Sequence, residues 1–520
     1  MSDVTLTYLI LGAVVAVFVW DKLPVAIVAI GVATSLWATG VLTLEQALAG
    51  FGDPSVLFIA SLFVVAAALD ETGVTTWAGQ KLIAGAGDSR TRVIVLMMLA
   101  CAGLTALITP NGSVAALLPV VVVMAVRLRQ TPSQLLIPLA FAAHAGALLV
   151  LTASPVNVVV SEAADDVGVG PFGFFDFALV GLPLLVGSIL IVLFLGPHLL
   201  PHREPKTIQR DFSTLARTLV EQYRLEGAPE QLLTRREGVA EVVIPPRSEL
   251  IGEVAFPGMV TDSGDLVMLA IQRREENLTG ETTLEAGDTL LLRGTWGDLD
   301  YHLDDPAVLV VDDPEDIRRQ VVPLGQGAKR SLAILAGMVL LLATGIAPPA
   351  IAGLVAACAI VLVGVLSIEQ AYRGIQWTTV ILVAGMIPLS TAMTSTGAAE
   401  QLADGLVQVF GDAGPRMLLV GLVLLVAALG ALISGMATVL IVIPIALSAA
   451  AELGVSPKPV LMAVCVATAA AFLTPVATPA NMMILEPGGY RFGDYWKLGL
   501  VLTLLFGLVA VFLVPVIWAF

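Results

Sequence analysis

The polar residues with the spacing of a binding site occur as two copies of one short motif. The first copy is Ser154-Pro155-Val156-Asn157, and the second is Thr478-Pro479-Ala480-Asn481, at a numbering offset of 324. Each copy interrupts an apolar run, at residues 141–160 and 462–485. Proline breaks a helix and frees backbone carbonyls, which a bilayer tolerates only where protein or a watery cavity covers them. The paired interruption therefore predicts a polar binding site inside a membrane-embedded chain.

Two further polar interruptions precede these breaks. One is Thr109-Pro110-Asn111-Gly112-Ser113, inside the apolar residues 93–126, and the other is Ser434-Gly435-Met436-Ala437-Thr438, inside residues 417–451. In the first of these segments each apolar arm has about 15 residues, which is short of the ~20 that a spanning helix needs. Both segments are therefore predicted to be re-entrant hairpins with polar tips.

The four interruptions offer hydroxyls, amides and helix ends, but no lysine or arginine in the middle of these segments. Neutral donors and the positive ends of half-helices would then hold an anion. The alternative is that the hydroxyls satisfy carbonyls of their own helices. The candidate binding residues are Thr109, Asn111, Gly112, Ser113, Ser154, Pro155, Asn157, Ser434, Gly435, Thr438, Thr478, Pro479 and Asn481.

His144 stands alone in the apolar run that contains the first break. An ionisable side chain in such a run is a functional candidate by default, and histidine is suited to carrying a coupling proton near neutral pH. The alternative is a neutral histidine that packs and forms hydrogen bonds. The residues leave both roles open.

Composition identifies the chain as a membrane protein. Of 520 residues, 57% are hydrophobic and 13% charged, with a mean hydropathy of +0.93, which is too apolar for a soluble globular protein. The three cysteines lie in separate apolar runs, so neither a disulfide framework nor a zinc site is expected. No HExxH or convincing GxSxG motif is present, so a membrane enzyme is disfavoured, and no nucleic-acid partner or organic cofactor is expected.

Ten spans are expected in two groups of five. The apolar runs lie at residues 4–20, 23–40, 55–69, 135–160 and 177–195, and again at 332–344, 350–366, 378–393, 460–485 and 498–518. Residues 41–47 (VLTLEQA) match residues 365–371 (VLSIEQA) at the same offset of 324. The chain is therefore predicted to be an all-α polytopic membrane protein with two repeats, residues 1–200 and 327–520. Each repeat holds five transmembrane helices and one re-entrant hairpin.

An odd number of spans per repeat inverts the second repeat, and the loop charges agree with this. With the N-terminus outside, the inside loops hold most of the lysines and arginines, as the positive-inside rule requires. Both termini are then outside an inner (plasma) membrane, and residues 201–326 are cytoplasmic. This insert is predicted to be a small α/β domain, with a helix at 211–225 and strands at 239–244, 266–272 and 289–293.

On these residues the chain resembles the divalent anion:sodium symporter family. The matching segments are residues 50–56 (GFGDPSV), the two hydroxyl-Pro-x-Asn breaks, and residues 487–495 (PGGYRFGDY). The insert is similar to the C-terminal domain of potassium-channel regulators (RCK-C type), at residues 248–252 and 284–290. The resemblance implies a homodimer, elevator-like motion of a transport part against a scaffold, and dicarboxylate, citrate or sulfate as substrate. It also implies a small ligand of the insert, nucleotides included.

One departure from that family concerns the coupling ion. Members that bind sodium typically carry Ser-Asn-Thr at each hairpin tip, where this chain has Thr109-Pro110-Asn111 and Ser434-Gly435-Met436. Side-chain oxygen is lost, and sodium is bound by oxygens. Weak or absent sodium dependence is expected, with a proton gradient or exchange in its place. Any sodium would bind near Asn111, Asn157 and Asn481, where backbone carbonyls can still coordinate it.

Three functional classes remain at this point. The leading one is a secondary active transporter of small anions that uses alternating access, regulated by its insert. The second is a ligand-gated anion channel or uniporter, although no TVGYG-like filter is present. The third is an exporter of arsenite or another oxyanion from the same broad superfamily.

Overall fold

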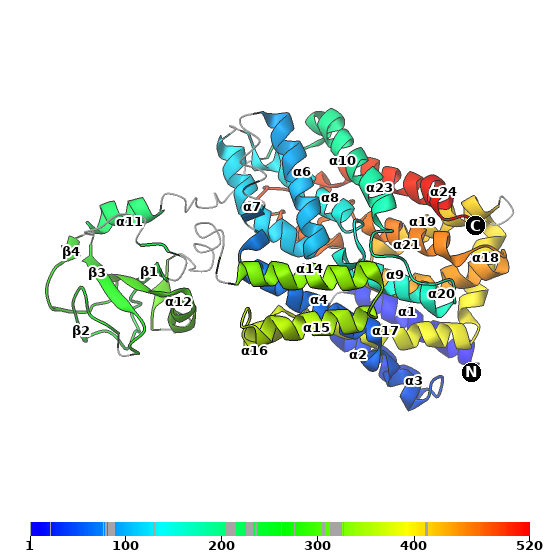
Figure 1. Ribbon diagram of the computed structural model, residues 1–520, viewed down its shortest axis with the longest axis horizontal. Helices are drawn as coiled ribbons and strands as arrows, with labels where there is room; N and C mark the ends of the chain where they lie inside the picture. Colours follow the sequence, from blue (N-terminus) through cyan, green and yellow to red (C-terminus); the bar gives the residue numbers. More distant parts are fainter. Residues whose placement is uncertain are drawn as a thin grey trace. The chain divides into compact units, whose positions relative to one another are not determined.

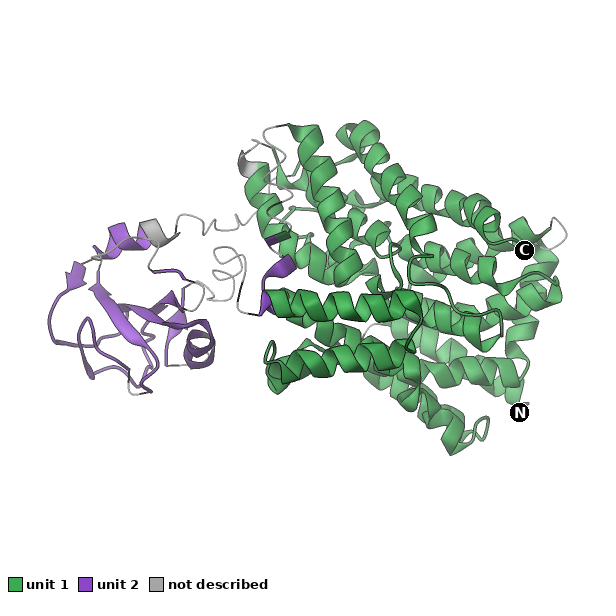
Figure 2. Ribbon diagram, viewed as in Figure 1, with its two compact units in different colours: residues 1–70, 78–208, 329–520 green, residues 71–77, 209–328 purple. Residues whose placement is uncertain are grey.

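The structure is a computed structural model of the 520-residue chain. It describes all residues except 1, 21, 76, 79–80, 82–88, 128–129, 204–214, 225–231, 235–236, 262, 275, 304–306, 312–324, 326 and 411–413. The chain divides into two compact units (Figure 2). The helical unit comprises residues 1–70, 78–208 and 329–520, and the inserted unit comprises residues 71–77 and 209–328.

The first part of the chain, up to the insert, is mainly helical in its described residues (Figure 1). Its helices are α1 (Asp3–Trp20), α2 (Val25–Ala38), α3 (Leu44–Leu48), η1 (Ala49–Gly52), α4 (Pro54–Glu71), α6 (Arg90–Leu107), α7 (Pro110–Arg127), η2 (Pro132–Gln134), α8 (Leu136–Gly146), η3 (Leu151–Ala153), α9 (Pro155–Asp166) and α10 (Ala178–Leu199).

The last part of the chain repeats this order. Its elements are α14 (Ala328–Thr344), α15 (Pro349–Leu362), α16 (Ile368–Gly374), α17 (Trp377–Ser395), α18 (Ala398–Phe410), α19 (Pro415–Gly430), α20 (Gly435–Glu452), α21 (Pro457–Ala469), η7 (Pro475–Ala477), α22 (Pro479–Met483), η8 (Phe492–Asp494), α23 (Trp496–Leu508), the π-helical turn η9 (Val509–Leu513) and α24 (Val514–Ile517).

Local structure follows the sequence repeat. The matched heptapeptides both form a capping box, in which the hydroxyl of Thr43 or Ser367 caps a short helix and the glutamine three residues on returns the bond. Reciprocal bonds of this kind satisfy two otherwise unpaired amides at a helix start. The same short sequence therefore begins α3 and α16 in the same way.

The number of full-length spans is lower than expected. Among the described residues, seven helices are long and apolar enough to cross a bilayer, or up to eight if the bent pair α18–α19 counts as one span. Five of the ten expected spans are among these seven helices, and the other two, α6 and α20, are hairpin arms. The remaining five expected spans fall short because α2 and α15 have 14 residues each, α14 has 17, and the fourth span of each repeat is divided at its break.

The hairpin arms are longer than predicted. Helices α6, α7 and α20 have 18 residues each, and α19 has 16. The arms gain length because residues 110–113 and 435–438, expected as polar tips, form the first turns of α7 and α20. Only residues 108–109 and 431–434 separate the two helices of each pair.

Helices from the two repeats pack closely against each other at two glycines of the second repeat, Gly385 and Gly353. Gly385 on α17 lies against Ala29 on α2, where an added Cβ would come 2.6 Å from the Ala29 carbonyl oxygen. Gly353 on α15 lies against the Ser61 hydroxyl on α4, which an added Cβ would overlap. Gly353 is the equivalent of Ala29 at the offset of 324, and Gly385 is the equivalent of Ser61. The two contacts are therefore equivalents of each other with the repeats exchanged.

The inserted unit contains a five-stranded antiparallel sheet in the order β4-β3-β6-β1-β7 and a two-stranded sheet β2-β5. The predicted strands are present as β1 (Glu237–Val243), β3 (Val267–Arg273) and β6 (Thr289–Thr295). The short strands are β2 (Val254–Ala255), β4 (Glu276–Leu278), β5 (Thr282–Thr283) and β7 (Leu309–Val310), and the helices are α11 (Leu215–Tyr223) and α12 (Trp296–Leu303). The start of the helix predicted at 211–225 lies outside the described residues.

Candidate functional site

Both breaks are built in the same way. Each begins where a buried helix ends, α8 or α21, passes through a 3-10 turn, η3 or η7, and restarts at a proline. The hydroxyls of Ser154 and Thr478 accept from the amides of Val156 and Asn481 in the new first turns. Proline at the first helical position has no amide to leave unpaired. The two prolines thus start new helices rather than kink existing ones.

The two asparagines of the motif satisfy the carbonyls that the breaks release. Nδ2 of Asn157 donates to the carbonyls of Ala147 at 2.7 Å and Val150 at 2.9 Å. Nδ2 of Asn481 donates to the carbonyls of Ala471 at 2.8 Å and Thr474 at 3.2 Å. Both side chains are buried. Inside a membrane these carbonyls would otherwise lack donors, so each asparagine holds its own break in shape.

The oxygen atom of each amide is contacted from the other repeat. The Cys465 thiol on α21 lies 3.3 Å from Oδ1 of Asn157. Nε2 of His144 on α8 lies 3.3 Å from Oδ1 of Asn481 and 3.3 Å from Oγ1 of Thr478. The two breaks are therefore joined across the repeats.

The hairpin tips resemble the breaks in their capping. The Thr109 hydroxyl accepts from the Gly112 amide, and the Ser434 hydroxyl accepts from the Ala437 amide. Four helices at these interruptions, α7, α9, α20 and α22, therefore begin with a hydroxyl cap, which is a favoured residue type for that position. Each capping oxygen accepts an amide and keeps its own hydroxyl hydrogen as a donor.

The buried hydroxyls of the tips are satisfied locally. Ser113 Oγ lies 2.5 Å from Thr105 Oγ1 and donates to the Pro110 carbonyl, and Thr438 donates to the Ser434 carbonyl. Asn111 is partly exposed, and no hydrogen bond of its side chain is recorded among the described residues. Of the candidates, Asn111 and the four capping hydroxyls retain polar groups for a ligand.

A small cavity lies at the second break and the second hairpin tip. Its volume is about 40 Å³, and its lining includes the threonines Thr438, Thr468, Thr474 and Thr503 together with Gly435 and Phe472. Three of these threonines donate to backbone carbonyls of their own helices, which leaves lone pairs free. Oγ1 of Thr474 is buried without a hydrogen-bond partner in the described structure. The space is near that of one water molecule or small ion.

The first break lacks two of the threonine hydroxyls that line this cavity at the second break. At the offset of 324, Val150 stands in the place of Thr474 and His144 in the place of Thr468. Thr468, Thr474 and Thr503 are not among the site residues predicted from the sequence, because those residues were chosen for features that both repeats share. The comparison of Thr474 with Val150 was the available signal, whereas nothing in the sequence indicated Thr503.

Close backbone approach fixes both breaks against the fifth span of their repeat. An added Cβ on Gly181 of α10 would overlap the Leu148 carbonyl, and one on Gly499 of α23 would overlap the Phe472 carbonyl. Leu148 and Phe472 are equivalent positions at the offset of 324. Each break is thus supported by a glycine that no larger residue can replace without displacing backbone.

The structure brings only some of the predicted site residues into direct contact. It brings His144, Thr478 and Asn481 together, and it places Gly435 and Thr438 at the cavity beside the second break. No hydrogen bond among the described residues links one hairpin tip to the other. Asn157, Asn481, Ser113, Thr438 and His144 are buried, whereas Ser434 and Pro479 are exposed and the other candidates are partly exposed.

The segment after the second break anchors it to neighbouring turns. The Tyr495 hydroxyl donates to the Asn481 carbonyl at 2.7 Å, and the Tyr490 hydroxyl donates to the Ser133 carbonyl at 2.5 Å. Asp494 accepts two hydrogen bonds from Arg203, at 3.1 and 3.2 Å. The connection toward the insert, through Arg203, is therefore held by the same segment that supports the second break.

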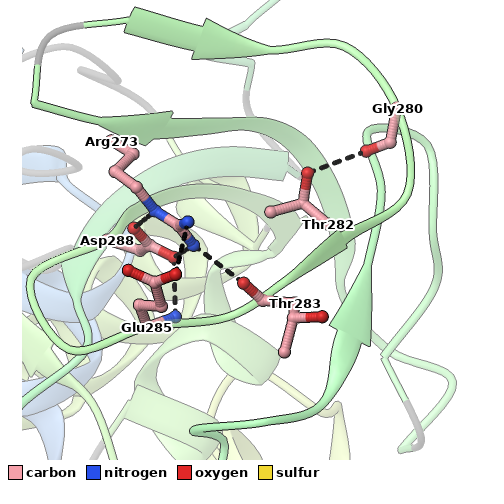
Figure 3. A network of polar contacts seen from close by, with 6 residues as sticks. All are labelled: Arg273, Gly280, Thr282, Thr283, Glu285 and Asp288. Carbon is pink, nitrogen blue, oxygen red and sulfur yellow. Dashed lines mark hydrogen bonds and ion pairs between the residues drawn. The ribbon is translucent and has the colours of Figure 1, made fainter.

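The inserted unit has its own polar network (Figure 3). Arg273 donates to both oxygens of Asp288 at 2.7 Å, and also to Glu285 and to the Thr283 carbonyl. Burial alone would raise the pKa of Asp288, but the hydrogen bonds from Arg273 and the Glu285 amide and the Arg273 charge lower it below its usual value. This network holds the loop between β5 and β6.

A cavity of about 260 Å³ lies in the same unit. Its lining is mainly apolar, with Glu253, Thr261, Ser263 and His302 as polar members and no lysine or arginine among the described residues. It therefore offers no basic partner for a nucleotide phosphate. The nucleotide ligand expected from the resemblance stays a prediction.

These features define a class of protein. Apolar helices of spanning length, two breaks with satisfied carbonyls, and capped polar tips in the interior are characteristic of a polytopic membrane transporter with discontinuous helices. In the described residues no group of three or more His, Cys, Asp or Glu is arranged to hold a metal ion.

Comparison with known proteins gives the family. The family model described as "Citrate transporter" matches residues 15–414, and the one described as "Sodium:sulfate symporter transmembrane region" matches residues 315–520. The chain belongs to the divalent anion:sodium symporter family, as its motifs predicted, and it is a transporter rather than an enzyme.

Relatives extend over the whole chain. The uncharacterized transporter YfbS of Escherichia coli is 31% identical over 98% of both chains, and the uncharacterized transporter sll0640 of Synechocystis is 26% identical over 99% of this chain and 97% of that protein. Sodium/sulfate cotransporter 1 of Chlamydomonas reinhardtii is 23% identical over 54% of this chain and 32% of that protein. The crystal structure of the Alcanivorax borkumensis YdaH transporter has a similar fold, with a TM-score of 0.50, 15% identity and coverage of 98% and 99%.

Proposed function

We propose that this chain is a secondary active transporter of small anions in the dicarboxylate, citrate or sulfate class. One observation carries the proposal: four helix starts at the two tips and the two breaks are capped by hydroxyls whose own hydrogen is not used in the cap. Helix N-termini and neutral donors are a suitable environment for an anion. The citrate and sulfate families of its relatives support the same substrate class.

In this proposal Thr109, Asn111, Ser154, Ser434 and Thr478 contact the anion. They are the candidates with an exposed or partly exposed polar group. Gly112, Pro155, Gly435 and Pro479 keep the backbone at these helix starts close to the ligand. Asn157, Asn481, Ser113 and Thr438 hold the surrounding backbone instead, since their side chains are buried and hydrogen-bonded.

The coupling-cation site of the proposal is the cavity at the second break. Within a mainly apolar lining it offers four threonine hydroxyl oxygens, one of them buried without a partner among the described residues, and no basic side chain. Oxygen atoms are the ligands of a hard cation such as sodium. Bound sodium would supply positive charge beside the anion. Because Val150 and His144 replace the threonines at the first break, we assign one sodium site to this chain and none to the first break. This proposal replaces the weak or absent sodium dependence that the hairpin tips led us to expect.

The mechanism in this proposal is elevator-type alternating access between two inverted repeats, with five spans and one hairpin in each. The reciprocal contacts of Gly385 with Ala29 and of Gly353 with Ser61 support a two-fold relation between the repeats. The chain would form a homodimer in the inner membrane, with the insert in the cytoplasm and both termini outside. Lysines and arginines in the loops assigned inside support that orientation.

Substrate-driven counterflow in liposomes tests the function. Purified protein is loaded with unlabelled sulfate, citrate or succinate, and entry of the labelled anion is followed against protein-free vesicles. A carrier is stimulated by substrate on the far side, whereas a channel is not. Entry of an anion without such stimulation would favour the channel alternative, and entry of none of the panel would refute the proposed substrate class. Including arsenite in the panel tests the exporter alternative.

Regulation by the insert is a separate part of the proposal. The Arg203–Asp494 ion pair ties the connection toward the insert to the segment that supports the second break. A ligand that prefers one conformation of the insert would then bias transport. Deleting residues 207–326 and joining the ends with a flexible linker should change the uptake rate. Unchanged uptake and unchanged dimerisation would show that the insert neither regulates nor assembles the transporter.

A further inference from the structure

His144 contacts the second break through one ring nitrogen. Nε2 lies 3.3 Å from Oδ1 of Asn481 and 3.3 Å from Oγ1 of Thr478. The ring lies edge-on to Phe472, with centroids 5.4 Å apart. Only 4% of the residue is exposed. A buried imidazole from the first repeat therefore touches the polar residues that form the break in the second.

The hydrogen bonds of Asn481 determine where the imidazole hydrogen is. Nδ2 of Asn481 donates to the carbonyls of Ala471 and Thr474, which only an NH₂ group can do. The remaining amide atom, Oδ1, faces His144 and can only accept. For this contact to be a hydrogen bond, Nε2 must carry the hydrogen, and Oγ1 of Thr478 is then a second acceptor of the same N–H group. A neutral ring with its hydrogen on Nε2 satisfies this contact, and no second proton is needed.

The corresponding contact at the first break is made by a different donor. There the Cys465 thiol contacts Oδ1 of Asn157. At the offset of 324, the residue equivalent to Cys465 is Phe141 and the one equivalent to His144 is Thr468, which bonds to the Val464 carbonyl instead. Neither donor therefore has an equivalent donor at the corresponding position of the other repeat. Each asparagine is oriented by a donor that only the other repeat supplies.

We propose that His144 is a positioning residue that orients the Asn481 amide, and does not carry the coupling proton. Through Asn481 it fixes the carbonyls of Ala471 and Thr474, and both of these residues line the cavity at the second break. The inference rests on the proposed function for its transport readout. His144→Gln keeps an N–H donor and cannot accept a proton, whereas His144→Leu removes the donor.

The first test is uptake in proteoliposomes, measured against pH and sodium concentration. His144→Gln should keep the wild-type dependence on pH, while His144→Leu should raise the half-saturating sodium concentration about tenfold, as expected for a buried acceptor left unpaired. A variant that merely folded less well would lower the maximum rate alone. Loss of the proton-driven component in His144→Gln would overturn the inference. If His144→Leu does not reach the membrane, the pH dependence of uptake by His144→Gln alone tests whether His144 carries the coupling proton.

The second test does not depend on transport. The four histidines are labelled with ¹⁵N in the full-length protein in lipid nanodiscs, and the His144 signals are assigned by their loss in His144→Gln. A neutral ring with hydrogen on Nε2 should persist between about pH 5 and 8. A ring that titrates in this range would overturn the inference even if no anion of the panel is transported. If no anion of the panel is transported but the His144 ring does not titrate, the proposed function is refuted and the inference about His144 stands.

Discussion

Asn157 and Asn481 make the same two hydrogen bonds, each from its amide nitrogen to the carbonyls ten and seven residues earlier in the chain. The two asparagines are themselves related by the repeat offset of 324. Equivalent bonds at equivalent positions show that each asparagine satisfies carbonyls of its own break. Mutating either asparagine should therefore affect stability as well as uptake.

Asn481→Ala should abolish uptake. The substitution leaves the Ala471 and Thr474 carbonyls without their donor, and an unsatisfied buried polar group costs about 1–3 kcal/mol. Uptake should therefore fall together with the melting temperature in detergent, and Asn157→Ala should behave alike. Thr34→Ala, at an exposed hydroxyl on α2, is the control. Wild-type uptake and stability in both asparagine variants would show that the breaks do not need these bonds.

Gly499→Ala should destabilise the helical unit by about 1–3 kcal/mol, as overpacking does. Its Cβ would overlap the Phe472 carbonyl at the second break. Gly507→Ala, on the same helix, is the matched control because its Cβ would meet only a Val423 methyl at 3.6 Å. The measurement is thermal unfolding of both variants in the same detergent. Equal melting temperatures would contradict the close approach at Gly499.

Thr474→Val should weaken sodium activation of uptake while leaving the apparent affinity for the anion unchanged at saturating sodium. The hydroxyl of Thr474 is the one that lacks a partner at the cavity, so its removal takes a ligand from the proposed cation site. Uptake is measured as choline is replaced by sodium at fixed pH. With one site the wild-type response should show no cooperativity, and Val150→Thr is the matched control at the first break. A steep, cooperative sodium response would show that a second cation site exists.

The insert should lose stability in acid through Asp288. The pKa of this carboxyl is lowered in the folded unit, so its contribution is present above the unfolded value of about 3.9 and is lost as the pH falls through the folded value. Pepsin cleavage within the insert should therefore accelerate as the pH falls below about 4. Asp288→Asn should be cleaved faster at higher pH and show less of this acceleration. Asp265→Asn, at a more exposed ion pair with His302, is the control, and identical profiles would contradict the prediction.

The predicted orientation is testable by thiol labelling in sealed, right-side-out cells. Asp165→Cys should react with an impermeant reagent added outside, and Glu276→Cys should not. Exposed Cys358 is first replaced by serine, which leaves the buried Cys101 and Cys465. Labelling of the Glu276 variant in intact cells would place the insert outside and overturn the topology. The further position suggested by the sequence, Asp412, lies outside the described residues.

The sequence by itself determined the elements that proline, hydroxyl and apolar patterning control locally. Apolar runs indicated the helices, the prolines at 155 and 479 indicated the two breaks, and the offset of 324 related one break to the other. These features depend on neighbours within a few residues, so local rules suffice. The strands of the insert were predictable for the same reason, because apolar residues in short runs bounded by Asp and Gly favour strands and turns. The helix start at Pro110 was not predicted, because residues 109–113 were expected to form a polar tip.

Tertiary structure alone decided what each polar side chain does. Whether an asparagine faces a ligand or its own break depends on carbonyls ten residues away that only the folded turn brings within reach. The partners His144 and Asn481 are separated by 337 residues, and no pattern within either segment encodes that distance. The threonines of the cavity come from three helices and a break. Their convergence depends on how those elements pack, which the single sequence does not reveal.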